Sequence, residues 1–182
     1  MTLSCVQSLC VRTFSIAAIC LGAAPTMSAA QEVCHSYGTQ LGDFRKCVSS
    51  VLPPQGKNTY GPEHLNGTTN GAWCEGVPGP GADQTVTFHS KPANMVGAVM
   101  ITNGYARDDK SFRNNGRVKR AQIETSAGYK NEITLKDERR PQEVKFKPAR
   151  VEWIRLTILD VYPGSRKDQD TCLSMFSPAL DG

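Results

Sequence analysis

The segment NGAWCEGVPGPG, Asn70–Gly81, decides how the rest of the chain can fold. It is too rich in glycine and proline to be a helix or an inner strand. It nevertheless carries the bulky Trp73 and Cys74, and a cysteine can form a disulfide. Rigid, cross-linked loops of this kind either close a small core or frame a binding site, so the fold depends on the partner of Cys74.

Residues 1–30 have the layout of a secretory signal peptide. The only charge, Arg12, precedes the apolar run Phe14–Ala24, and the small residues Ser28 and Ala30 follow it. The apolar run is too short to span a bilayer. We expect cleavage after Ala30 and a periplasmic or secreted product with no membrane span.

The remaining cysteines predict a disulfide framework. Of the seven cysteines, three (Cys5, Cys10, Cys20) lie in the leader, which leaves Cys34, Cys47, Cys74 and Cys172. An even number in an exported protein implies two disulfides, with three possible connectivities. The most natural pairing joins Cys34 to Cys47 and Cys74 to Cys172. Because these bridges use every cysteine of the exported chain, a catalytic thiol is not expected.

Length and charge exclude several classes of protein. The 182 residues suffice for one domain, and 39% hydrophobic residues fit a globular core. The formal net charge is +4, and no basic run is interleaved with aromatic residues, so nucleic acid is not expected as a partner. The nearest run, Arg117–Arg120, is interrupted by valine and is predicted to be the solvent face of a strand.

Short strands separated by turns fill the chain after residue 80 and predict an all-β sandwich or barrel. Val86 and Phe88 alternate within 84–89, and the parity of 117–125 slips once, which indicates a bulge. The segment 151–161 is apolar on both faces and belongs in the interior of a sheet, so Trp153 is predicted to be a core residue. Further strands are predicted at 95–104, 132–136, 143–147 and 170–176.

The domain organisation follows from composition. Residues 31–50 are expected to form an N-terminal segment clipped by its own disulfide. The stretch 52–62, LPPQGKNTYGP, is a linker-like entry to the β-sandwich domain at 51–182.

Several segments resemble a known family. HLNGTTNGAWCEGVPGPG is similar to the early loop of discoidin-type domains, the galactose-binding-like jelly rolls of coagulation factors and carbohydrate-binding modules. The ordered set AWCEGVPGPG, ITNGYA, NNGRVKR and LTILDVYPGSRKDQDTCLS resembles the NAD glycohydrolase translocation (NADase-type glycan-binding) domain over about residues 51–178. The resemblance implies a jelly-roll β-sandwich that binds without catalysis. In the family's toxin a separate domain cleaves NAD, so the resemblance does not lead us to expect that activity here.

Discoidin-type modules often hold a structural calcium ion near this loop, through an acid in the loop and a glutamate in the last strand. The corresponding positions here are Asn66 and Met175. Calcium prefers six to eight oxygen ligands with carboxylates among them, so two anionic ligands are missing. Asn66, Thr69 and backbone carbonyls could still offer oxygens, but we expect no metal and no cofactor.

The polar loop 103–117, NGYARDDKSFRNNGR, is the first candidate site, because planar forks and amides match adjacent sugar hydroxyls and aromatic rings offer platforms. The predicted ligand-binding residues are Asn103, Tyr105, Arg107, Asp108, Phe112, Arg113, Asn114 and Asn115. The alternative is a solvated loop in which Asn-Asn-Gly forms a turn. A second candidate is 162–167, chiefly a tight turn. Trp73 could stack on a sugar, but is predicted to plug the sandwich beside its disulfide.

No catalytic residues are predicted. His35, His64 and His89 match no metal-binding spacing, and His89 is expected to be a satisfied surface or edge histidine. Asp108 and Asp109 are adjacent and point in different directions rather than at one substrate. The predicted function is therefore glycan recognition by loops at one end of a β-sandwich. The alternative is a protein–protein adaptor of a toxin or envelope complex, with an exposed hydrophobic patch around 103–117; the oligomeric state stays open.

Overall fold

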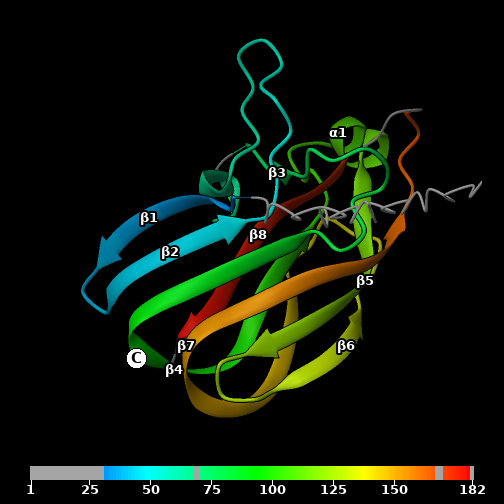
Figure 1. The fold of residues 1–182 in the computed structure, drawn as a ribbon. Coiled ribbons are helices and arrows are strands. Elements are labelled where there is room, and N and C mark those ends of the chain that lie inside the picture. The colour runs from blue at the N-terminus through cyan, green and yellow to red at the C-terminus, as the bar shows by residue number, and fades with distance from the viewer. Residues whose placement is uncertain (1–30, 68–69, 167–169, 181–182) are drawn as a thin grey trace, which may run out of the picture.

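The computed structural model describes residues 31–67, 70–166 and 170–180, so the predicted leader lies outside the described part. Nearly all regular structure is β (Figure 1). The elements are β1 (Val33–Thr39), β2 (Gly42–Val48), η1 (Pro62–His64), β3 (Trp73–Cys74), β4 (Thr85–Asn103), α1 (Asp109–Asn114), β5 (Gly116–Thr125), β6 (Lys130–Thr134), β7 (Gln142–Tyr162) and β8 (Thr171–Leu180).

Two long bent strands, β4 and β7, build both layers of the sandwich. Their halves at 85–89 and 153–157 pair with each other in a front sheet of order β1-β2-β4-β7-β5-β6. Their other halves pair in a back sheet, where β8 lies beside β4 and β3 beside β8 (Figure 1). The jelly-roll β-sandwich prediction is confirmed. The segments predicted as four separate strands are halves of two, because register shifts bend each strand without ending it.

The core lies between the two sheets and follows the period-2 alternation of the strands. Val86 and Phe88 point inward from β4, as predicted, and Ile154, Leu156 and Ile158 do so from β7; all are almost completely buried. The bulge predicted in β5 is present as register shifts between Val118 and Ala121.

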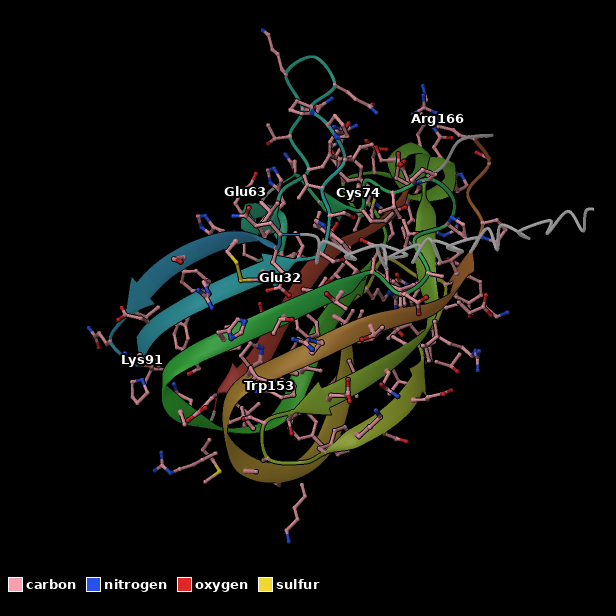
Figure 2. All side chains as sticks on the ribbon, in the orientation of Figure 1. Glu32, Glu63, Cys74, Lys91, Trp153 and Arg166 are labelled. Carbon is pink, nitrogen blue, oxygen red and sulfur yellow. A yellow bond between two sulfur atoms is a disulfide. The ribbon has the colours of Figure 1, made fainter. Side chains whose placement is uncertain are left out.

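Trp153 corrects the sequence prediction. The strand β7 is an interior strand, paired on both sides, but only one of its faces meets the core. Trp153 lies on the other face and is only partly buried (Figure 2). The Arg155 guanidinium carbon lies 5.5 Å from the centroid of the Trp153 ring, so an apolar side chain here packs against a cation at the surface.

Arg117 and His89 also differ from expectation. Arg117 is buried and does not lie on the solvent face. The bulge after Val118 changes which side chains of β5 point to solvent, so the alternation in the rest of β5 does not extend to Arg117. His89 lies in the middle of the front sheet, between Arg45 and Trp153 in register, and its buried Nε2 has no hydrogen-bond partner. It is therefore neither an edge histidine nor a satisfied one.

Residues 31–50 form an integral part of the front sheet. They fold as the β1–β2 hairpin, and β2 pairs with β4 over residues 43–48. Phe44 and Val48 of β2 belong to the main core. The disulfide Cys34–Cys47 joins directly opposed residues of the hairpin, as predicted.

The segment Asn70–Gly81 closes the sandwich. The disulfide Cys74–Cys172 joins β3 to β8, which confirms the predicted long-range bridge. Trp73 is fully buried, and its Nε1 donates to the carbonyl oxygen of Ser50 at 2.8 Å. The buried carboxylate of Glu75 accepts from the Val77 amide at 2.8 Å and the Thr171 amide at 3.1 Å, and burial raises its pKa. Trp73 is thus structural and offers no exposed ring to a ligand.

Candidate functional site

The loop 103–117 contains one helix, α1, which was not predicted. Asp108 is its N-cap: the Oδ1 atom accepts from the Ser111 amide at 2.6 Å. The hydrogen bonds from Ser111 and the neighbouring Arg107 lower the pKa of Asp108 to about 2, so this carboxylate is ionised at neutral pH. Asp109 points away from Asp108, as expected for adjacent acids. Its carboxylate pairs with Arg139 at 2.8 Å.

A polar pocket of about 300 Å³ opens beside α1 at this end of the sandwich. We call it the loop-end pocket. Three stretches that are distant in sequence line it: 52–60, the loop and helix from 105 to 115, and the connection from β7 to β8. The lining residues are Leu52, Gln55, Asn58, Tyr60, Tyr105, Arg107, Asp108, Lys110, Ser111, Asn114, Asn115, Arg166 and Asp170.

Five of the eight predicted binding residues line this pocket: Tyr105, Arg107, Asp108, Asn114 and Asn115. The other three do not. Asn103 is fully buried, and Phe112 is buried beneath the Arg117 guanidinium, whose carbon lies 5.3 Å from the ring centroid. Arg113 is exposed in the last turn of α1.

Arg107 organises the wall of the pocket. Its guanidinium lies over the Tyr105 ring at 4.8 Å from the centroid, and donates to the Tyr105 hydroxyl at 3.2 Å and the Ser111 hydroxyl at 2.9 Å. Its Nε donates to Asp108 Oδ2 at 3.1 Å. The Tyr105 ring is thus covered by the arginine and packed edge-on against Tyr60, with 6.3 Å between centroids. The pocket presents fixed polar groups rather than a bare aromatic platform.

Sequence reasoning missed the residues from outside the loop. The stretch 52–62 was interpreted as a linker, yet Gln55 and Asn58 pair as a bridge and Tyr60 is buried against the disulfide Cys74–Cys172. The pKa of Tyr60 is raised by burial and by Tyr105. Arg166 also lines the pocket, within the second predicted segment 162–167; Lys167 lies outside the described residues. The signal available in the sequence was Tyr60, an aromatic residue in a stretch that is otherwise rich in glycine, proline and polar residues.

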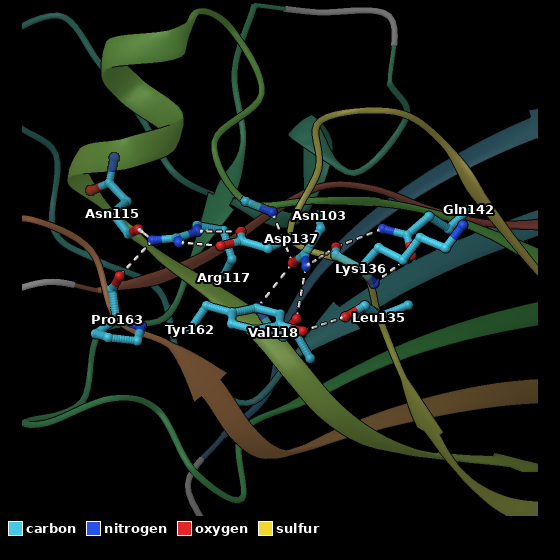
Figure 3. Close-up of polar contacts among 11 residues, drawn as sticks. Asn103, Asn115, Arg117, Val118, Leu135, Lys136, Asp137, Gln142, Tyr162 and Pro163 are labelled. Carbon is cyan, nitrogen blue, oxygen red and sulfur yellow. Dashed lines mark hydrogen bonds and ion pairs between the residues drawn. The ribbon is translucent and has the colours of Figure 1, made fainter.

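Arg117 fixes the loops around the pocket from below (Figure 3). Its Nε and Nη2 donate to the two carboxylate oxygens of Asp137 at 2.9 and 2.7 Å. Its Nη1 donates to the carbonyl oxygens of Asn115 at 3.0 Å and Pro163 at 2.7 Å. One buried guanidinium therefore joins the end of α1, the β6–β7 loop and the β7–β8 loop.

Asn103 completes this support (Figure 3). Its Nδ2 donates to the Val118 carbonyl at 2.7 Å, and its Oδ1 accepts from the Val118 and Gly104 amides at 2.9 and 3.0 Å. Gly104 follows with φ +65°, a conformation that favours glycine, and a Cβ here would lie 2.8 Å from the Phe112 ring. The predicted binding residue Asn103 thus shapes the loop from inside.

The donors at the expected calcium positions do not fit the ion. Asn66 and Met175 lie directly opposite each other as a bridge, which supports their assignment as a matched pair of positions. The Asn66 amide nitrogen donates to the Glu63 carbonyl at 3.1 Å, and the Met175 sulfur fills the space beside Gly67. Calcium requires oxygen ligands, and a thioether supplies none. Thr69 lies outside the described residues.

The fold and pocket define a class: a galactose-binding-like β-sandwich with a polar site formed by loops at one end. The family model of the NAD glycohydrolase translocation F5/8 type C domain matches residues 38–177. The chain belongs to this family. No curated protein matches the sequence.

Solved structures with the same fold include family 32 carbohydrate-binding modules. The module of Clostridium perfringens NanJ in complex with galactose has a TM-score of 0.54 at 16% identity, over 80% of this chain and 98% of that one. A module of C. perfringens GH89 in complex with GalNAc-β-1,3-galactose has a TM-score of 0.53 at 12% identity, over 74% of this chain and 94% of that one. The Streptococcus pneumoniae EndoD module has a TM-score of 0.52 at 11% identity, over 75% of this chain and 96% of that one.

None of the helices in the described part of the chain has the length and apolar character needed to cross a membrane.

Proposed function

We propose that the chain is an exported, non-catalytic carbohydrate-binding module that recognises sugar hydroxyls in the loop-end pocket. The observation that carries the proposal is the clustering of five predicted binding residues in one polar pocket of a family 32-like sandwich. The similar modules solved with galactose and GalNAc-β-1,3-galactose support the ligand class.

The pocket chemistry suits a polyhydroxylated ligand. A sugar hydroxyl both donates and accepts hydrogen bonds. Arg107 and Lys110 supply donors, the ionised Asp108 supplies acceptors, and the amides of Asn58 and Asn114 supply both. A volume of about 300 Å³ lies at the small end of the range for ligand pockets and suits one or two sugar units.

The protonation state of Asp108 excludes this residue as the general acid of a glycosidase. A glycosidase needs a general acid whose pKa is raised so that it holds a proton at neutral pH. Asp108 has the opposite shift, because Ser111 and Arg107 stabilise its ionised form. The predicted leader and the two disulfides support export to a periplasmic or extracellular location.

The alternative of a protein adaptor predicts an exposed hydrophobic patch around 103–117. Among the described residues, the exposed large hydrophobic side chains are Val33, Tyr37, Leu41 and Met95. These belong to β1, the β1–β2 turn and β4, and none lines the loop-end pocket. The pocket therefore favours a small polar ligand over a protein surface.

A glycan-array screen, followed by calorimetric titration with galactose and GalNAc-β-1,3-galactose, tests the proposal. Arg107→Ala should weaken binding at least tenfold, since it removes charged hydrogen-bond donors and the cover of Tyr105. Arg120→Ala, at an exposed arginine of β5, is the matched control and should bind normally. If no array glycan binds while cross-linking recovers a protein partner, the adaptor is the correct function.

A further inference from the structure

A second, larger groove lies on the outer face of the front sheet and shares no residue with the loop-end pocket. Its volume is about 790 Å³. The strands β1, β2, β4 and β7 line it, and Lys91 at the bend of β4 is among the lining residues (Figure 2). We call it the sheet groove.

A row of three side chains crosses the sheet groove from strand to strand. Arg45 of β2 is in register with His89 of β4, and His89 is in register with Trp153 of β7. Neighbouring strands lie about 4.8 Å apart, so the row spans roughly 10 Å across the sheet. This places a cation, an imidazole and an indole side by side on one face.

Three charged side chains of the groove are uncommitted. Among the described residues, the side chains of Arg45, Lys91 and Glu152 make no hydrogen bond and no ion pair, and all three line the groove. The Ser90 hydroxyl, by contrast, donates to the Pro92 carbonyl and accepts from Asn94. The Nε2 atom of His89 has no hydrogen-bond partner, but it is buried beneath the surface of the groove. The three charged side chains are therefore the groups that can bond a ligand in the groove.

Trp153 is held as a rigid platform. The Arg155 guanidinium covers one side of its ring, and Arg155 is itself fixed by donating to the Thr87 hydroxyl at 3.1 Å. The ring lines the groove and is partly exposed. Aromatic rings packed in this way offer a flat apolar surface with little loss of conformational entropy on binding.

The charges of the groove balance. The cations Arg45 and Lys91 are matched by the acids Asp43 and Glu152. Burial and the positive charge of Arg45 lower the pKa of His89, so the imidazole is neutral at pH 7 and can donate or accept a hydrogen bond. A groove without net charge does not favour a phosphate or a polyanion. It favours a neutral ligand that carries many hydroxyls.

We propose that the sheet groove is a second saccharide site, which takes a linear neutral oligosaccharide stacked on Trp153 with its hydroxyls bonded to Arg45 and Glu152. The groove is more than twice as large as the loop-end pocket, about 790 against 300 Å³, so it accommodates several sugar units. This site goes beyond the proposed function and does not depend on the loop-end pocket.

Tryptophan fluorescence reports on this groove alone. The chain has two tryptophans; Trp73 is fully buried, so acrylamide quenching reads Trp153. We would titrate chitohexaose, cellohexaose and laminarihexaose. At least one should protect Trp153 from acrylamide, whereas galactose at the loop-end pocket should not. Arg45→Ala and Glu152→Ala should weaken this binding roughly tenfold, with Arg120→Ala as the unchanged control.

Two results would overturn the proposal. The first is that none of the three oligosaccharides protects Trp153, in a protein whose native melting transition shows that it is folded. The second is protection that grows with protein concentration in the absence of sugar, which would assign the groove to a second copy of the chain. Trp153→Phe should abolish the signal in every titration and serves as the optical control.

Discussion

The disulfide Cys74–Cys172 should contribute more stability than Cys34–Cys47, and the difference follows from chain length. The bridges close loops with sequence separations of 98 and 13 residues. On the chain-entropy model they restrict the unfolded state by about 4.7 and about 2.9 kcal/mol. The double variant Cys74→Ala/Cys172→Ala should therefore lose about 1.8 kcal/mol more than Cys34→Ala/Cys47→Ala.

Equilibrium unfolding in urea, followed by fluorescence and circular dichroism, measures this difference. With an m-value of about 2 kcal/mol/M, the midpoints should fall by roughly 2.4 and 1.5 M. Binding adds a second readout: Cys74 and Cys172 pack with Tyr60 and Tyr105 beneath the loop-end pocket, so only the first variant should lose galactose affinity. Equal midpoint shifts, or a larger loss from the short bridge, would refute the reasoning.

Three further predictions follow from buried or capping groups. Arg117→Leu should lower the free energy of unfolding by about 3–5 kcal/mol in urea titrations, because it removes the four hydrogen bonds of a buried guanidinium, whereas Asp137→Asn should cost less since Asp137 is partly exposed. Burial lowers the pKa of Lys46 to about 8, below its unfolded value, so stability should rise by roughly 2 kcal/mol from pH 8 to 9.5; Lys46→Met should abolish that rise in the same titrations. The hydrogen bonds that lower the pKa of Asp108 stabilise the fold above pH 4, and this stabilisation is lost as the pH falls to about 2. Asp108→Ala should therefore speed amide exchange in α1 at pH 6, and the stability of α1 in this variant should no longer depend on acid.

The sequence predicted the strands and the disulfides because both leave a local signature. The alternation of Val86 and Phe88 requires only neighbouring residues to be compared, and the presence of two disulfides, though not their connectivity, follows from the number of cysteines and the expected export. The bends of β4 and β7 could not be predicted, since a register shift keeps the chain extended while it changes sheets. At these points the sequence analysis predicted that one strand ends and another begins, whereas the structure has a bend within a single strand.

The errors at Trp153 and Arg117 share a physical cause. Side-chain type was used to infer burial, yet Trp153 covers its ring with Arg155 at the surface and Arg117 satisfies its charge inside the protein. Each depends on a partner, Thr87 for Arg155 and Asp137 for Arg117, that is distant in sequence. Hydrophobicity alone cannot reveal such pairs.

Only one wall of the candidate site could be predicted, because the other wall comes from residues that are distant in sequence. Tyr105 and Arg107 lie in one polar loop whose composition indicated binding. The opposite wall comes from Tyr60 and Arg166, which the crossing of strands brings to the same end of the sandwich. The helix α1 has only six residues, too few for a helical period to emerge, and only the cap at Asp108 marks it.

Each disulfide lies beside one of the two proposed sites. All seven residues of β1 are exposed, so this strand buries little apolar surface to hold it in place. A strand at the edge of a sheet with so little burial is marginally stable on its own. The bridge Cys34–Cys47 supplies the missing restraint and fixes the wall of the sheet groove that Tyr37 forms. The bridge Cys74–Cys172 joins the two-residue strand β3, which is fully buried, to β8 beneath the loop-end pocket. The short bridge therefore stands where burial is too small to fix the geometry that binding requires, whereas the long bridge reinforces a strand that burial already holds.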